Sequence, residues 1–253
     1  MSAIAFGVDI GGSGIKGAPV DTATGELAAS RLKIPTPSPS TPVAVIDVIS
    51  QLINTFDLDQ AVPIGVTFPA PILGGIVPSV ANLDQSWVGV NLAQLLKQHT
   101  GRSVYVVNDA DAAGYAEVRY GAARGRLGTV AVITLGTGIG TALVTDGKLW
   151  PGSELGHVII DGRDAETWAA SSAKEREDLG WKAWAKRLQR YFDELDRLLH
   201  PDLFVVGGGV SRKSEHFLPH LKLRVPIIPA ALRNAAGIVG AAGLAADSAS
   251  QAS

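Results

Sequence analysis

The stretch Asp9-Ile10-Gly11-Gly12-Ser13-Gly14-Ile15-Lys16-Gly17 decides our interpretation of the fold. The apolar run at 4–8 predicts a buried strand before it, and the small and apolar residues at 15–20 predict a second, antiparallel strand after it. Glycines let the chain turn sharply and leave backbone N–H groups accessible to a bulky anion. Taken alone, the stretch is interpreted equally well as a glycine-rich hairpin without a ligand.

The turn differs from two familiar nucleotide motifs. It lacks the Gly-Lys-Ser/Thr ending of a Walker loop, and it leads into a strand, whereas the dinucleotide fingerprint opens a helix. We expect it to bind phosphate with residues of the turn, and we expect Asp9 at the strand end to hold Mg²⁺ through water. The candidate phosphate ligands are Gly11, Gly12, Ser13, Gly14 and Lys16.

Composition narrows the class of protein. With 253 residues and 46% hydrophobic content, the chain can bury a large core, and we expect two lobes. It contains no cysteine, which excludes disulfides and thiolate metal sites and is compatible with a reducing compartment. The first residues do not resemble a secretory signal and the apolar runs are strand-sized, so we expect a cytoplasmic protein without a membrane partner. A net charge of -2 argues against a nucleic-acid partner.

Periodicity and turn residues predict the elements of the first half. We expect Thr41 to cap a helix that begins at Pro42 and Asn91 to cap a shorter one that stops at Gly101. The long loop at 69–87 has a length typical of binding loops. The predicted strands are 26–34, 62–68 and 103–107, and the predicted helices run from 42 to about 56, from 92 to 99 and from 109 to about 120.

The second half repeats the opening pattern. A strand at 129–135, a glycine turn at 136–140 and a strand at 141–144 follow one another as they do around Gly11. This weak internal repeat predicts two lobes of similar design, facing each other across a cleft. We expect an N-terminal lobe at 1–107, a C-terminal lobe at 108–234, and a last helix at about 235–248 that packs back on the first lobe. The other predictions are a helix at 172–199 and a strand at 203–206.

Glycine-rich strand ends at 11, 136 and 207 leave space that suits a phosphate or nucleotide. In these motifs the chain resembles the ROK sugar kinases of the actin-like, hexokinase-like ATPase superfamily, and most closely their polyphosphate glucokinase branch. The resemblance implies an α/β, two-lobed fold built from ribonuclease H-like repeats. The matching segments are 9–17, Asn108-Asp109-Ala110-Asp111-Ala112-Ala113, 134–141, Glu154-Leu155-Gly156-His157, 206–211 and 234–242.

The resemblance also implies a reaction and its residues. Asp109 is expected to be the catalytic base facing the 6-hydroxyl of glucose, or of mannose, although an Asn-Asp pair after a strand is also a common helix cap. Asn82 and Asn108 offer donors and acceptors to sugar hydroxyls, with Asn82 equally interpretable as a turn residue. The implied sugar ligands are Asn82, Asn108, Asp109, Glu154, His157 and, more weakly, Asp161.

The donor is expected to be polyphosphate or ATP, with Mg²⁺. Thr137, Gly138 and Gly140 are expected to bind phosphate opposite the first turn, and Gly207, Gly208 and Gly209 to flank adenosine when ATP is used. A polyphosphate track needs cations, but the available ones are equally interpretable as scattered surface charges. They are Lys16, Arg124, Arg126, Lys148, Arg163, Lys174 and Arg176.

Many members of the resembled family hold structural zinc after the Gly-His pair. The absence of cysteine rules out such a zinc site here and raises the question of how the loop of His157 is braced. The early first strand leaves no room for the helix-turn-helix of the family's repressors. Alternatives to a polyphosphate glucokinase are an ATP-only hexokinase and a non-catalytic sugar sensor. A homodimer is implied by the family.

Overall fold

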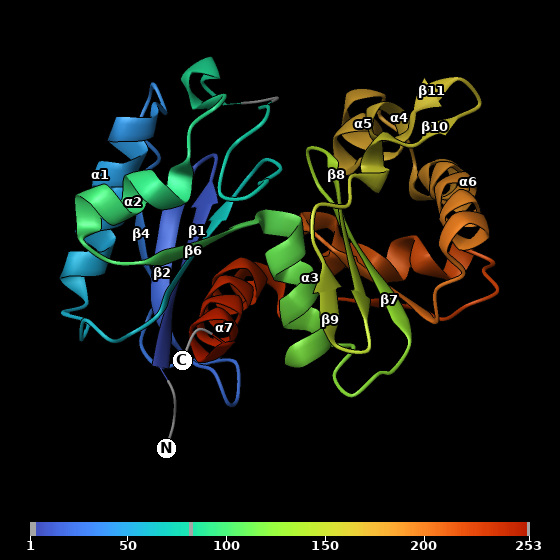
Figure 1. Cartoon of the computed structure of the whole chain (residues 1–253). Helices are drawn as coiled ribbons and strands as arrows, with labels where there is room; N and C mark the ends of the chain where they lie inside the picture. Colours follow the sequence, from blue (N-terminus) through green and yellow to red (C-terminus); the bar gives the residue numbers. More distant parts are fainter. Residues whose placement is uncertain (1–3, 81–82, 252–253) are drawn as a thin grey trace. The chain divides into compact units, whose positions relative to one another are not determined.

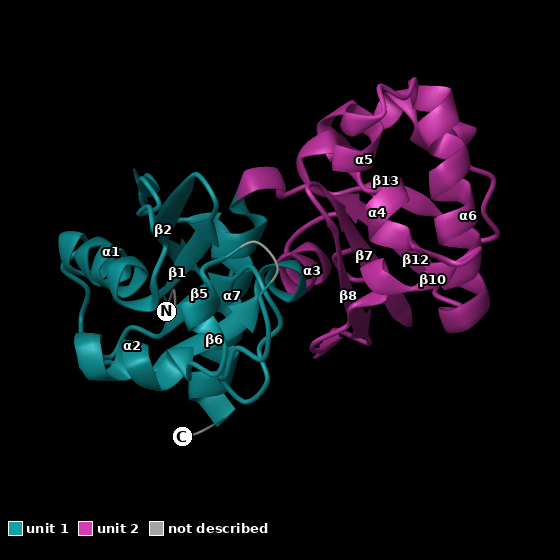
Figure 2. Cartoon of the chain, turned by 90° about the horizontal axis from the view of Figure 1, so that it is seen from above, with its two compact units in different colours: residues 1–112, 235–253 teal, residues 113–234 magenta. Residues whose placement is uncertain are grey.

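The computed structural model describes residues 4–80 and 83–251. The chain forms two compact units (Figure 2): unit 1 comprises Met1–Ala112 and Ala235–Ser253, and unit 2 comprises Ala113–Asn234. The boundary falls inside helix α3 (Asp109–Arg119), so Asp109, which we expected in the second lobe, belongs to unit 1 with the strand that it follows.

Unit 1 contains a six-stranded sheet with the order β3-β2-β1-β5-β6 and with β4 beside β2. Strand β1 pairs with β2 antiparallel, whereas β1, β5 and β6 are parallel. The predicted strand at 26–34 is wrong as one element, because the exposed residues 28–31 bury no side chain and interrupt it. The strands are β1 (Ile4–Gly11), β2 (Gly14–Asp21), β3 (Glu26–Leu27), β4 (Leu32–Ile34), β5 (Ile64–Phe68) and β6 (Val104–Asn108).

Helices α1 (Pro42–Thr55) and α2 (Leu92–Thr100) pack on one face of this sheet. Asn91 accepts a hydrogen bond from the N–H of Gln94, and Gly101 ends α2 in the left-handed region, so both predicted ends of α2 are confirmed. Thr41 occupies the cap position of α1 with Pro42 after it, but its side chain makes no capping hydrogen bond. The loop between β5 and α2 carries the short helix η1 (Gln85–Trp87).

Helix α7 (Ala236–Gln251) packs against β1 and β5 in unit 1, and Figure 1 shows it in red beside the sheet. Glycines make this approach possible. A Cβ on Gly7 would lie 2.0 Å from the carbonyl oxygen of Ile238, and a Cβ on Gly65 would lie 1.9 Å from that of Ala241. The alternate residues on the same strands, such as Phe6 and Val66, are fully buried in the core beneath α1 and α2.

Unit 2 repeats the pairing pattern of unit 1 in a five-stranded sheet with the order β13-β12-β7-β8-β9. The glycine hairpin β7–β8 is antiparallel, and β12 and β13 run parallel to β7 on its other side, as β5 and β6 do beside β1. The strands are β7 (Thr129–Leu135), β8 (Ile139–Thr145), β9 (Lys148–Trp150), β12 (Leu203–Gly207) and β13 (Ile227–Pro229), and a separate hairpin joins β10 (Ile159–Ile160) to β11 (Arg163–Asp164).

The predicted helix at 172–199 is wrong as one element. Asp178 adopts a positive φ of 47° and Gly180 occupies the N-cap position of the next helix, so the helical conformation is interrupted at these residues. Within the described residues, no helix combines the length and apolar character needed to cross a membrane. The remaining helices are α4 (Ala165–Ala169), α5 (Ser171–Arg176), α6 (Trp181–Leu199), η2 (Leu155–His157), η3 (Gly209–His216), η4 (Leu218–His220) and η5 (Arg233–Ala235).

Replacing Gly65 with alanine tests the packing of α7. The new methyl group would overlap the backbone of Ala241, so the free energy of unfolding should fall by about 1–3 kcal/mol or more. Urea denaturation of Gly65→Ala measures this loss. Gly180→Ala is the control, because no atom lies within 4 Å of the added Cβ. Equal stability of the two variants would contradict the packing described for α7.

Candidate active site

In unit 1 the first glycine turn lies beside Asp9. One carboxylate oxygen of Asp9 is 3.3 Å from Nζ of Lys16, its partner across the β1–β2 pair, and the other accepts a 3.1 Å hydrogen bond from Thr67. Gly237 faces the same carboxylate, since a Cβ there would lie 2.9 Å from it. Strands β1, β2 and β5 and the first turn of α7 therefore fix Asp9 in one orientation.

The residues at Asp9 fit a hydrated magnesium ion. Mg²⁺ keeps several waters and usually takes one or two carboxylates plus substrate phosphates. The Asp9 side chain is 21% exposed and offers such a carboxylate. Within the part of the chain that the structure describes, no group of three or more His, Cys, Asp or Glu side chains could hold a metal by itself. The donor set thus suits an ion that is completed by water and substrate.

The tip of the first turn is exposed at Gly12 and Ser13. No atom lies within 4 Å of a Cβ built on Gly12, whereas Thr36 donates a hydrogen bond to the carbonyl oxygen of Gly11 and holds the base of the turn. The exposed tip leaves space for an anion, and phosphate binding by Gly11, Gly12, Ser13, Gly14 and Lys16 stays a prediction.

Asn108 and Asp109 join β6 to α3. The side chain of Asn108 accepts hydrogen bonds from the N–H groups of Ala110 and Asp111, at 2.8 and 3.2 Å, so Asn108 caps the helix. Asp109 is exposed on the first turn of α3, and its Oδ1 also accepts a hydrogen bond from the N–H of Ala110 at 2.8 Å. The capping role that we weighed for the pair is thus shared by Asn108 and Asp109. The catalytic role of Asp109 stays a prediction, and Asn82 lies outside the described residues.

In unit 2 the Glu154–His157 turn is held firmly against β8. Position 156 accommodates only glycine, because a Cβ on Gly156 would lie 2.1 Å from the carbonyl oxygen of Ile139. The buried hydroxyl of Thr141 donates to the carbonyl oxygen of Ser153 at 2.8 Å and accepts from the N–H of Leu155 at 3.1 Å. Glu154 and His157 are exposed on this fixed turn. The turn can therefore present an acceptor and a donor to one ligand.

The surroundings raise the pKa values of both side chains. Desolvation raises the pKa of Glu154, with a further rise from Glu166 and an opposing effect from His157. The hydrogen bond that His157 donates to Asp164 raises the pKa of His157, against the effect of desolvation. Nδ1 of His157 is 2.9 Å from the Asp164 carboxylate, so Nδ1 carries the proton in that bond and Nε2 remains for a ligand.

Ion pairs brace the loop that follows His157. Asp164 holds His157 and also caps α4 by accepting from the N–H of Glu166 at 3.0 Å. Asp161, in the turn between β10 and β11, accepts two hydrogen bonds from Arg190 of α6, at 2.9 and 3.0 Å. This contact gives Asp161 a bracing role, and its assignment to the sugar stays a prediction.

Glu166 lies beneath the second glycine turn. It accepts the N–H of Ile139 at 2.8 Å, and a Cβ on Gly138 would lie 2.2 Å from its carboxylate. Ser172 fastens the turn from the other side, through bonds to the carbonyl oxygens of Gly136 and Thr137 at 3.1 and 2.6 Å. The sequence analysis did not identify Glu166 and Ser172 as residues that support the turn. Their only signal in the sequence is a position near the start of a helix. Phosphate binding by Thr137, Gly138 and Gly140 stays a prediction.

A cavity of about 530 Å³ adjoins this turn within unit 2. Gly209 lines it, and Gly208 before it adopts a positive φ of 81° where a Cβ would lie 2.2 Å from the carbonyl oxygen of Leu135. Adenosine binding by Gly207, Gly208 and Gly209 stays a prediction. The lining residues are Leu135, Gly136, Thr137, Ser171, Ser172, Lys174, Glu175, Trp181, Gly209, Val210 and Lys213.

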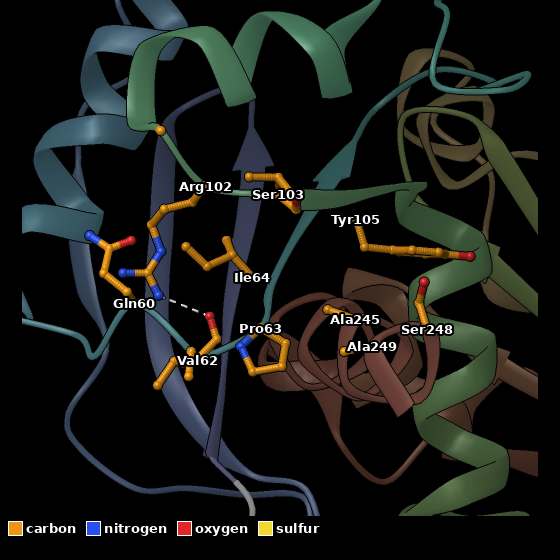
Figure 3. Close-up of a pocket in the computed structure, with 13 residues that line it drawn as sticks. Gln60, Val62, Pro63, Ile64, Arg102, Ser103, Tyr105, Ala245, Ser248 and Ala249 are labelled. Carbon is orange, nitrogen blue, oxygen red and sulfur yellow. Dashed lines mark hydrogen bonds between the residues drawn. The ribbon is translucent and has the colours of Figure 1, made fainter. Parts of the chain in front are cut away.

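Unit 1 contains a second cavity, of about 420 Å³, at the start of β5 and β6 and the end of α7. Figure 3 shows Arg102 beside it, with a 2.9 Å hydrogen bond to the carbonyl oxygen of Val62. Arg102 also donates to the carbonyl oxygens of Leu58 and Asp59, so it braces the segment that enters β5. None of the predicted site residues lines this cavity.

Replacing Asp164 with asparagine tests the His157 pair. Losing the charged partner should lower the pKa of His157 toward its ordinary value of about 6.5. Since folding raises this pKa, the pair stabilises the fold fully below about pH 6.5 and loses its effect as pH rises through the raised value. NMR titration of the His157 ring, assigned with His157→Gln, measures the shift. Asp161→Asn is the control in the same loop, and an unchanged His157 pKa in Asp164→Asn would refute the pairing.

The chain is similar to known proteins over nearly its whole length. A polyphosphate glucokinase of Mycobacterium tuberculosis is 47% identical over 238 residues, covering 94% of this chain and 89% of that protein. The structure of an inorganic polyphosphate/ATP-glucomannokinase from Arthrobacter sp. strain KM is 50% identical with a TM-score of 0.91, covering 97% of this chain and 99% of that one. A ROK family glucokinase from Streptomyces griseus, solved with glucose and AMPPNP, is 25% identical with a TM-score of 0.82, covering 96% and 99%.

The structural neighbours have the actin-like, hexokinase-like ATPase fold, so the predicted fold class is confirmed. The family model described as "ROK family" matches residues 5–173. This match spans both glycine turns, the Asn108-Asp109 pair and the Glu154–His157 turn. The chain belongs to the ROK family.

Proposed function

We propose that this protein is a sugar kinase that transfers a phosphoryl group from inorganic polyphosphate or ATP to the 6-hydroxyl of glucose. The observation that carries the proposal is the similarity to a polyphosphate glucokinase and a polyphosphate/ATP-glucomannokinase at 47% and 50% identity over almost the whole chain. The fixed positions of Asp109 in unit 1 and of Glu154 and His157 in unit 2 support it. Mannose is a second candidate acceptor, suggested by the glucomannokinase.

On this proposal Asp109, Glu154 and His157 bind the acceptor sugar. Glu154 accepts a hydrogen bond from one hydroxyl and His157 Nε2 meets another. Asp109 orients the 6-hydroxyl and takes its proton. An ordinary carboxylate is basic enough, because phosphoryl transfer passes through a loose transition state in which positioning matters more than base strength.

The donor phosphates are bound at the two glycine turns. Lys16 and the tip of the first turn neutralise phosphate charge. Asp9 would hold a hydrated Mg²⁺, which would supply further positive charge against the phosphates. Thr137 contributes from the second turn, which Glu166 and Ser172 keep rigid. A homodimer and a cytoplasmic location stay predictions from the family and the composition.

Replacing Asp109 with asparagine tests the acceptor chemistry. The variant keeps the shape of the side chain but cannot take the proton, so kcat should fall by about 10²–10⁴-fold while the glucose Kd stays within about threefold. A coupled assay for glucose 6-phosphate and calorimetric titration of glucose measure the two quantities. Asp47→Asn on the exposed face of α1 is the control. Near-normal turnover of Asp109→Asn would remove Asp109 from the mechanism.

Parallel assays with ATP and long-chain polyphosphate test the donor. We expect glucose 6-phosphate from both. Product from ATP alone would make the protein an ATP-only hexokinase, and glucose binding without product from either donor would make it a sugar sensor.

A further inference from the structure

Two lysines and a tryptophan form a cluster at the unit 2 cavity, which we call the Lys174 cluster. It consists of Lys174 on α5, Trp181 at the start of α6 and Lys213 on η3, and all three line the cavity of about 530 Å³. Nζ of Lys174 lies 4.4 Å from the centroid of the Trp181 ring, and Nζ of Lys213 lies 6.0 Å from it. Both ammonium groups are thus held at the indole by cation–π attraction.

The lysines of the cluster lack an acidic partner. Among the described residues, neither Lys174 nor Lys213 forms an ion pair, whereas Lys16 pairs with Asp9 and Arg176 with Glu177. Glu175 also lines the cavity, so the charged lining residues carry a net positive charge. Of the basic residues that we named as available for a polyphosphate track, Lys174 lines this cavity. Its charge is available to an anion.

The cluster is fastened to the second glycine turn. Ser172 on α5 bonds to the carbonyl oxygens of Gly136 and Thr137, and Lys174 follows two residues later on the same helix. Gly136 and Thr137 line the same cavity as the two lysines. A donor with its reacting end at this turn therefore extends through the cavity toward the cluster.

The Trp181 ring is already engaged by other groups. His216 stacks on it with a centroid distance of 5.2 Å and an interplanar angle of 21°, and Phe217 lies nearly parallel at 6.1 Å. The Trp181 ring therefore already contacts two ammonium groups and two aromatic rings of the same chain. An adenine base that stacked on this ring would have to displace them, whereas a chain of phosphates would complement the lysines.

We propose that the Lys174 cluster is a subsite for the internal phosphates of polyphosphate and selects this donor over ATP. The inference rests on the proposed function and deepens it. ATP and polyphosphate present the same reacting end. Beyond the third phosphate, however, polyphosphate continues as negative charge, whereas ATP ends in an uncharged nucleoside. Cations placed along the cavity beyond the turn favour the donor whose charge continues.

Lysine-to-methionine variants test the subsite, because methionine keeps the apolar stem against Trp181 and removes the charge. We expect the ratio of kcat/KM for long-chain polyphosphate to kcat/KM for ATP to fall about tenfold in Lys174→Met and in Lys213→Met, and about 100-fold in the double variant. Lys174→Arg should restore most of the ratio. Lys186→Met, on an exposed part of α6 outside the cavity lining, is the matched control.

Salt dependence supplies a second readout. Each lysine that contacts a polyanion releases counterions, so the slope of log KM for polyphosphate against log salt should become shallower by about one for each lysine removed. A purely structural role of the lysines would not change this slope.

The proposal is overturned if the ratio is unchanged in the double variant or shifts toward polyphosphate, or if the wild-type protein uses ATP but not polyphosphate. Failure of the proposed function looks different, since the wild-type protein then makes no glucose 6-phosphate from either donor. In that case calorimetric titration with long-chain polyphosphate decides the subsite: wild-type binding that is lost in the double variant supports it, and absent or unchanged binding refutes it.

Discussion

The arrangement of groups around Asp9 in unit 1 depends on the close approach of α7 to the sheet. The helix reaches β1 and β5 only because Gly7 and Gly65 present hydrogen where any other residue would place a methyl group on the helix backbone. The same approach places Gly237 against the Asp9 carboxylate. A segment distant in sequence thereby becomes one wall of the proposed magnesium site at Asp9.

The two units use the same glycine hairpin for different purposes. In unit 1 the tip at Gly12 is open, and Asp9 and Lys16 form an ion pair across its base. In unit 2 the turn is filled from beneath by Glu166, which also lowers the tendency of Glu154 to ionise. The unit 2 hairpin therefore acts as a rigid frame that links the second glycine turn, the Glu154–His157 turn and α5. In the loop that follows His157, Asp164 pairs with His157 and Asp161 pairs with Arg190, so a chain without cysteine holds His157 through side-chain contacts.

The sequence predicted the elements that are determined by interactions between residues close together in the chain. Periodicity and turn residues located the hairpins at Gly11 and Gly136, the Asn91 cap and the buried face of α1. The strand at 26–34 and the helix at 172–199 were mispredicted because the break in each depends on small or exposed residues and, at Asp178, on one positive φ, which composition does not reveal. Glu166, Ser172, Lys213 and Gly237 were missed as site residues because their roles come from partners distant in sequence. The resemblance to a family, rather than spacing, supplied the chemical roles of Asp109, Glu154 and His157.

We propose that Asp109, Glu154 and His157 act on one hexose, and a crystal structure of the protein with glucose tests this proposal. We expect a carboxylate oxygen of Asp109 about 2.6–3.2 Å from the 6-hydroxyl oxygen, with Glu154 and His157 on other hydroxyls of the same ring. Glucose bound with its 6-hydroxyl directed away from Asp109, or bound without contact to Glu154 and His157, would contradict it.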